Sequence, residues 1–164
     1  RQCLTGHERR KQSESARALD ILPSRLLQIK SPSPEKIRLL ENPRPGTDAS
    51  RYATVSHCWD SPTSHTIQLT SKSASRLQQR IDISDLGQIF QDVILAAQYL
   101  GIGYIWIDYL CIIQYSQDDW LKESTLMSTV HRNSTINIAK MFATDGRVSC
   151  FPPRDCSQRD RAWC

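Results

Sequence analysis

An amphipathic stretch that runs directly into an apolar one constrains the fold of this chain more than any other feature. Over residues 84–100 the apolar side chains recur three and four residues apart, which places them on one face of a helix. We expect Asp82 or Ser84 to cap the start of this helix and Gly101 to end it in a left-handed conformation. Residues 104–107 are then apolar without alternation, which is typical of a central parallel strand buried on both faces.

Elements on either side of this pair complete a βαβ succession. Residues 52–59 are rich in β-branched and aromatic side chains and predict a strand. A second helix is expected from about Asp118, followed by a strand at residues 135–139. Shorter elements are expected at residues 36–41, as a strand, and at residues 71–80, as a helix. This alternation predicts a single α/β domain in which helices flank a parallel sheet.

The length and composition fit one ordinary globular domain. The chain has 164 residues, of which 39% are hydrophobic and 23% charged, with a formal net charge of +4. Its apolar runs are too short to span a bilayer. We expect a polar lead-in at residues 1–18, the folded domain at residues 19–155, and a truncated-looking tail at residues 156–164.

The cysteines and the basic residues limit the expected ligands and partners. Six cysteines match no paired zinc-site spacing, so we expect no metal and interpret them as reduced thiols of a cytoplasmic protein. The one compact basic run, residues 9–11, is interpreted as a solvated tail. Because no face interleaves basic with aromatic residues, we expect no nucleic-acid partner.

Polar residues end two of the predicted strands, and ligands of open parallel sheets bind beyond the carboxyl ends of the strands. The first strand ends in Ser56 and Trp59, and the second ends at Asp108. Asp108 has two open interpretations, since it either orients Ser56 or caps the turn that follows. His57 and Cys58 are not expected to form a catalytic pair, because neighbours on a strand point to opposite faces.

Glu123 is the candidate acidic residue. It lies three residues after Trp120, on the apolar stripe that also holds Met127 and Val130. A carboxylate there is costly to desolvate unless it is paired or used in chemistry. Two interpretations stay open: either Glu123 has a structural place, at the rim of the stripe or paired with a nearby Lys or Arg, or it is a functional acid. Trp120 is interpreted as a core residue or as a stacking surface.

Several sequence blocks closely resemble the HET (heterokaryon incompatibility) family of fungi. The most specific are LGIGYIWIDYLCIIQ at residues 100–114 and DWLKES at residues 119–124, at the spacing typical of that family. Weaker matches are YATVSHCW at residues 52–59, LPSRLL at residues 22–27 and FPPR at residues 151–154. The chain departs from the family pattern at His57, Asp60, Gly87, Tyr109 and His131.

The resemblance implies a fold and an activity. HET domains trigger cell death after non-self recognition in fungi, and their core is similar to TIR domains, which have a flavodoxin-like parallel sheet. Several TIR domains cleave NAD+ with a glutamate in a W..E arrangement, which Trp120 and Glu123 match. By this resemblance Glu123 is the catalytic residue, and Ser56, Trp59, Asp108 and Trp120 bind NAD+ as a substrate, with no prosthetic group.

Three hypotheses follow for the function. An NAD+ nucleosidase activated by self-association predicts Glu123 in an open cleft beside Trp120 and near Ser56. A non-catalytic module that transmits a cell-death cue by associating with other signalling domains predicts Glu123 in an ion network, with an exposed apolar patch on a helix. A decayed copy predicts poor packing around Gly87 and Tyr109.

Overall fold

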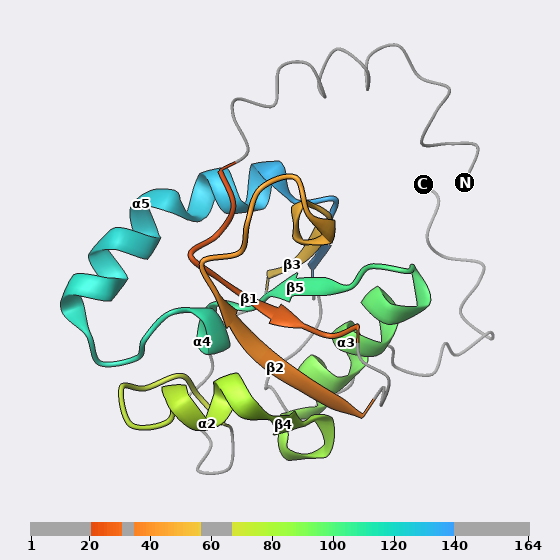
Figure 1. The fold of residues 1–164 in the computed structure, drawn as a ribbon, viewed down its shortest axis with the longest axis horizontal. Coiled ribbons are helices and arrows are strands. Elements are labelled where there is room, and N and C mark those ends of the chain that lie inside the picture. Colours follow the sequence, from red (N-terminus) through yellow and green to blue (C-terminus); the bar gives the residue numbers. More distant parts are fainter. Residues whose placement is uncertain (1–20, 31–34, 57–66, 140–164) are drawn as a thin grey trace, which may run out of the picture.

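The structure, a computed structural model, describes residues 21–30, 35–56 and 67–139. These residues form one α/β domain around a six-stranded sheet with the strand order β4-β2-β1-β5-β3-β6 (Figure 1). The strands are β1 (Arg25–Gln28), β2 (Lys36–Glu41), β3 (Tyr52–Ser56), β4 (Ile81–Asp82), β5 (Tyr104–Trp106) and β6 (Ile136–Ala139). The helices are α2 (Ala74–Gln79), α3 (Gln88–Tyr99), α4 (Asp108–Cys111) and α5 (Gln117–Asn133).

The predicted βαβ succession is confirmed in one half of the sheet. Strand β3 pairs in parallel with β5 on one side and with β6 on the other. In the chain, α3 lies between β3 and β5, and α5 lies between β5 and β6, as crossovers between strands of the same direction require. Residues 57–59 of the first predicted strand lie outside the described residues.

The other half of the sheet is antiparallel, so the sheet is mixed rather than wholly parallel. Strand β1 pairs antiparallel with both β2 and β5, and β2 pairs antiparallel with β4. The segment between β1 and β2 is short, and a short connection joins antiparallel strands because a parallel crossover needs a dozen residues or more. The short strand predicted at residues 36–41 is confirmed as β2.

Helix α3 ends as predicted but starts later. Its first residue is Gln88, Gly87 occupies the cap position, and no side chain caps the helix, so the prediction of an Asp82 or Ser84 cap is wrong. Residues 83–85 instead form a separate 3-10 turn. At the other end Gly101 has φ 72°, and the N–H groups of Gly101 and Ile102 donate to the carbonyls of Gln98 and Ala97 at 2.9 Å each. This is a Schellman ending.

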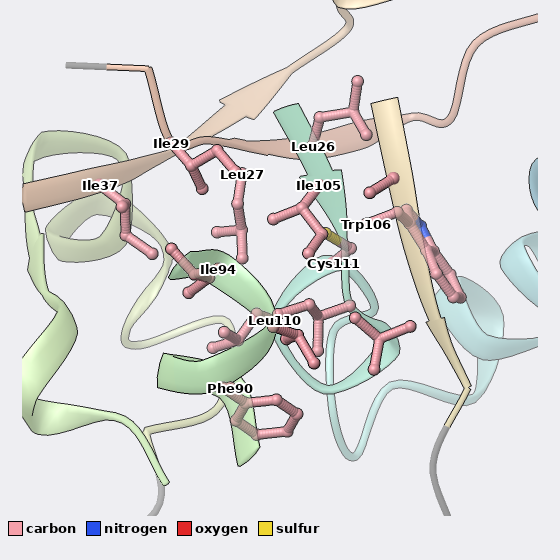
Figure 2. Close-up of a cluster of buried hydrophobic side chains, with 14 of the residues drawn as sticks. Leu26, Leu27, Ile29, Ile37, Phe90, Ile94, Ile105, Trp106, Leu110 and Cys111 are labelled. Atoms are coloured by element: carbon pink, nitrogen blue, oxygen red, sulfur yellow. The ribbon is translucent and has the colours of Figure 1, made fainter. Parts of the chain in front are cut away.

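Helices α3 and α5 cover opposite faces of the sheet. Leu27, Ile94 and Ile105 meet between α3 and the strands (Figure 2). On the other face, the Tyr52 hydroxyl donates to the carbonyl of Val130 in α5 at 2.7 Å, and the ring of Trp106 meets His131 edge-on at 5.4 Å. Among the described residues, no helix is both long and apolar enough to cross a membrane.

Candidate functional site

Strand register places three polar residues at the same end of the sheet, at the carboxyl ends of the parallel strands. Ser56 is the last residue of β3, and Asp108 follows β5 by two residues. Thr54 pairs with Trp106, so the same register places Ser56 level with Asp108. On the other side of β5, Leu27 pairs antiparallel with Ile105, which brings Arg25 to this edge as well. The parallel pairing of β3 and β5 thus places Ser56 and Asp108 at the same end of the sheet, and the antiparallel pairing of β1 adds the cation Arg25 there.

Ser56 is held by the neighbouring strand. Its hydroxyl lies 3.1 Å from Oδ1 and 3.0 Å from Nδ2 of Asn137 in β6. Thr54 lies two residues before Ser56, so both side chains are on the same face of β3. The Thr54 hydroxyl also donates to Oδ1 of Asn137, at 3.2 Å. Ser56 therefore presents a fixed hydroxyl at the edge of the sheet, suited to hydrogen bonding rather than to nucleophilic attack.

Asp108 is almost fully buried and is the first residue of α4, whose cap position is held by Ile107 without a side-chain capping bond. Its Oδ1 accepts from the backbone N–H of Tyr109 at 2.7 Å, at the start of the short helix α4. The charge of the Asp108 carboxylate also affects the pKa of His131 in α5. Burial lowers the pKa of His131, and the charge of Asp108 opposes this shift without cancelling it. His131 is therefore neutral near pH 7.

Glu123 is sealed inside the protein. It is 1% exposed, and neither carboxylate oxygen has a hydrogen-bond partner in the part of the chain that the structure describes. Its Oε1 lies 4.0 Å from Nη1 of Arg25 and 4.0 Å from Nζ of Lys122, whose side chain is 61% exposed. A buried carboxylate without donors is costly, so its presence requires an explanation.

Arg25 is the centre of the ion network around Glu123. Its Nη2 and Nη1 donate to the two carboxylate oxygens of Asp119 at 2.8 and 3.0 Å, and Nη1 also donates to the carbonyl of Cys111 at 3.1 Å. The Asp119 carboxylate accepts a further bond from the N–H of Ile113 at 2.7 Å. Such a two-pronged arginine–carboxylate pair is among the strongest ionic contacts in proteins.

The pKa shifts follow from this geometry. Burial raises the pKa of Asp119, but the hydrogen bonds and charge of Arg25 outweigh burial and hold that pKa below its ordinary value. Burial likewise lowers the pKa of Arg25, and Asp119 more than reverses the effect, so the pKa of Arg25 is raised. Cys111 is a free, buried thiol, and burial raises its pKa to about 12, which disfavours the reactive thiolate.

The inward stripe of α5 differs from the predicted one. Asp119 and Glu123, four residues apart, both face Arg25, and the stripe continues to the buried Val130. Trp120 lies off this stripe and is 54% exposed, so the prediction that it belongs to the stripe is wrong. One residue along a helix rotates a side chain by about 100°, which is the physical reason for the difference. Trp59 lies outside the described residues.

Exposed large apolar side chains lie at the start of α5, and we call this group the α5 patch. It consists of Tyr115, Trp120 and Leu121, which are 85%, 54% and 50% exposed. Tyr115 also has a left-handed backbone, with φ 66°, in the turn that precedes the helix. Side chains of this size are seldom left in water together without a partner.

Sequence reasoning did not single out Arg25 or Asp119. Both stood within the motifs LPSRLL and DWLKES, so a signal was present, but their pairing joins positions 94 residues apart. Within the described ranges, no group of His, Cys, Asp and Glu side chains has an arrangement that could hold a metal ion.

Comparisons with known proteins identify one family. The family described as Heterokaryon incompatibility protein (HET) matches residues 52–164. The match begins at the first residue of β3 and so includes Ser56, Asp108, Trp120 and Glu123, whereas Arg25 precedes it. No curated protein and no solved structure matches the chain.

Proposed function

Because the chain belongs to the heterokaryon incompatibility (HET) family, which implies a role in that process, we propose that it is a signalling module that self-associates to transmit a cell-death cue in fungal non-self recognition. The observation that carries this proposal is a contrast within α5. Glu123 is sealed against the sheet beside Arg25, while Trp120 and Leu121 of the same helix are exposed.

The α5 patch is suited to contact between copies of the chain. Tyrosine and tryptophan are enriched in the centres of protein interfaces, because they bury large areas at low entropic cost. The hydrogen bonds of Arg25 and Asp119 hold the start of α5 in place, because they join β1, the turn after α4 and the first turn of α5. A rigid support of this kind lowers the ordering cost of binding.

Self-association is tested by sedimentation across a wide range of protein concentration. We expect wild type to form larger species as concentration rises, and the double variant Trp120→Ser/Leu121→Ser to stay monomeric. A matched control is Leu95→Ser/Tyr99→Ser on α3, which removes two side chains that are 57% and 92% exposed. Wild type that stays monomeric throughout, or equal loss of association in the control, would refute the proposed surface.

A second candidate function is cleavage of NAD+, and the hydrogen-bond-free carboxylate of Glu123 favours it. Polar groups that are buried without partners are concentrated at functional sites, where their cost is tolerated for chemistry. In this reaction the bond between ribose and the nicotinamide nitrogen breaks, and its electron pair neutralises the pyridinium. Water adds to the ribose carbon and releases a proton, so the products are nicotinamide and ADP-ribose.

Glu123 has a defined part in that reaction. Its carboxylate stabilises the positive charge that develops on the ribose, or binds the ribose hydroxyls. Ser56 and Asp108 at the same sheet edge are the proposed polar contacts to NAD+, and Trp59 and Trp120 the proposed stacking surfaces. Because Glu123 is 1% exposed, α5 must move before a substrate reaches it.

Release of nicotinamide by concentrated protein distinguishes the two candidates. Catalysis predicts release by wild type and by Glu35→Gln, an exposed glutamate remote from Arg25, and none by Glu123→Gln. No release from any of the three, under conditions in which sedimentation shows association, refutes catalysis and leaves the signalling module. Equal release by all three refutes the role of Glu123.

A further inference from the structure

A polar hollow lies away from the candidate site. Its volume is about 290 Å³, and its polar lining comes from Gln28, Lys30, Lys36, Arg38, Gln79 and Arg80. These residues lie in β1, β2 and α2 or just beyond the ends of β1 and α2, on the side of the domain that holds the antiparallel strands (Figure 1). Four of these six side chains are cations, and none of the described residues that line the hollow is a carboxylate.

Strand register explains why these side chains gather. Gln28 of β1 pairs with Arg38 of β2, and Lys36 pairs with Asp82 of β4. Because side chains alternate along a strand, Lys36 and Arg38 share one face of β2, opposite the buried Ile37. The apolar face of β2 thus packs into the hydrophobic core, and the cationic side chains on its other face line the hollow.

Two of the four cations have exposed ion-pair partners, and the other two have no ion-pair partner among the described residues. Arg80 is paired with Asp82 at 2.7 Å, and Lys30 lies 3.6 Å from Asp48 in a pair whose side chains are 74% and 80% exposed. Exposed pairs of this kind are weak. Among the described residues, neither Lys36 nor Arg38 has a carboxylate within salt-bridge distance.

Arg38 is also oriented for a ligand. Its Nε donates to Oε1 of Gln28 at 2.7 Å, which fixes the plane of the guanidinium group. Its two terminal nitrogens have no hydrogen-bond partner in the part of the chain that the structure describes. A guanidinium group held in this way presents two parallel donors, the geometry that binds phosphate in a two-pronged manner.

The hollow is distinct from the candidate site at the other edge of the sheet. Arg25 and Lys30 lie five residues apart along β1 and beyond its end, which corresponds to about 16 Å of extended chain. The carboxyl-end residues Ser56 and Asp108 lie at the Arg25 edge, and the hollow lies toward the Lys30 edge. A ligand in the hollow would not touch Glu123.

We propose that this hollow binds the phosphoanhydride group of a small di- or triphosphate. Several cations spread over two strands and a helix end match a chain of phosphates better than a single one. The volume is near the lower limit for small-molecule sites, and the described residues that line the hollow include no aromatic side chain to stack on a base. The phosphates are therefore the recognised part, and any remaining portion of the ligand projects into solvent.

Calorimetric titration with inorganic pyrophosphate tests this site directly. We expect wild type to bind pyrophosphate, with an affinity that falls as salt is added, because the contacts are ionic. The double variant Lys36→Gln/Arg38→Gln should bind at least about tenfold more weakly. Lys72→Gln/Arg51→Gln removes the same two charges from exposed positions outside the hollow and should bind like wild type.

Each further arm of the titration supports or overturns the proposal. Similar affinity for ADP and pyrophosphate supports recognition of the phosphoanhydride, whichever molecule carries it. Binding of orthophosphate as tightly as pyrophosphate, or equal weakening in both double variants, overturns the site. Absence of pyrophosphate binding by wild type at low salt does so as well, provided that circular dichroism shows folded protein.

Discussion

Asp119 and Glu123 face the same arginine from the same helix, yet their replacement should change stability in opposite directions. Asp119 makes two hydrogen bonds to Arg25 and one to the Ile113 backbone, and its side chain is 11% exposed. Glu123 is 1% exposed, makes no hydrogen bond to the described residues, and lies 4.0 Å from Arg25. The Asp119 carboxylate is therefore stabilised by hydrogen bonds and an ion pair, whereas the Glu123 carboxylate has no hydrogen bond to the described residues.

Replacing Asp119 should lower the free energy of unfolding, because Arg25 would lose its main ion-pair partner. Asp119→Asn removes the charge that neutralises Arg25 and puts an amide donor against guanidinium donors. Removing one partner of a buried ion pair costs about 3–5 kcal/mol, and the residual exposure of this pair favours the lower end, about 3 kcal/mol. With a urea m-value of about 2 kcal/mol/M, the unfolding midpoint should fall by about 1.5 M.

The balance for Glu123 is different. At 4.0 Å and an effective dielectric constant near 20, its attraction to Arg25 is about 4 kcal/mol before desolvation. Desolvating a carboxylate costs several kcal/mol, and here no hydrogen bond offsets that cost. Glu123→Met keeps the length of the side chain and removes the charge, while Arg25 retains Asp119. We therefore expect a stability between that of wild type and about 2 kcal/mol above it.

Urea unfolding of wild type, both single variants and the double variant at neutral pH tests the argument. The double variant should lose more than the sum of the singles, because Arg25 then retains only the exposed Glu41, 3.4 Å away. If Glu123→Met lowers the free energy of unfolding by 2 kcal/mol or so, Glu123 is a structural partner of Arg25 and the reasoning fails. A neutral Asp119→Asn would refute it equally.

Three further predictions concern single residues. Because burial lowers the pKa of His131 below 6.5, the unfolded chain binds more protons below that pH, so stability should fall as pH drops from about 7.5 to 5.5. His131→Tyr should reduce that fall while keeping an aromatic ring near Trp106, and equal pH dependence by urea unfolding would contradict this. Gly101→Ala should cost about 1–2 kcal/mol, measured by calorimetry, because φ is 72° and no atom lies within 4 Å of the added Cβ, so the cost is purely conformational. An unchanged melting temperature would refute that requirement. Cys111, with a pKa of about 12, should resist iodoacetamide at about pH 8 in native protein and react in urea, as followed by peptide mass spectrometry.

The parts of the fold that could be predicted depend on local patterns. Helix α3 and strand β5 were predictable because their apolar periods repeat within a few residues, and Gly101 because only glycine adopts positive φ freely. The start of α3 was misplaced, since Asp82 and Ser84 are good caps in isolation but lie in a separate strand and turn. Nothing in the local pattern distinguishes a helix cap from a polar turn residue.

The candidate site shows the same division. The sequence placed Ser56 and Asp108 at strand ends and Glu123 on an inward face, and the structure brings the first two to one sheet edge and buries the third. The inward-facing stripe of α5 could include either Trp120 or Asp119, and the choice depends on which of the two side chains finds a binding partner in the folded protein. Helical spacing permits either, and the decision rests on a cation from a distant strand.

By itself, then, the sequence determined the family, the α/β class and the local elements, because hydrophobic period, turn residues and motif spacing are properties of short segments. Only the tertiary structure decided that β1, β2 and β4 run antiparallel beside the parallel strands. It also decided that Arg25 neutralises Asp119 across 94 residues and that Glu123 is sealed while Trp120 is exposed. Strand pairing, ion pairing and burial are contacts between segments far apart in the chain, and their free energies depend on distances that no local pattern contains.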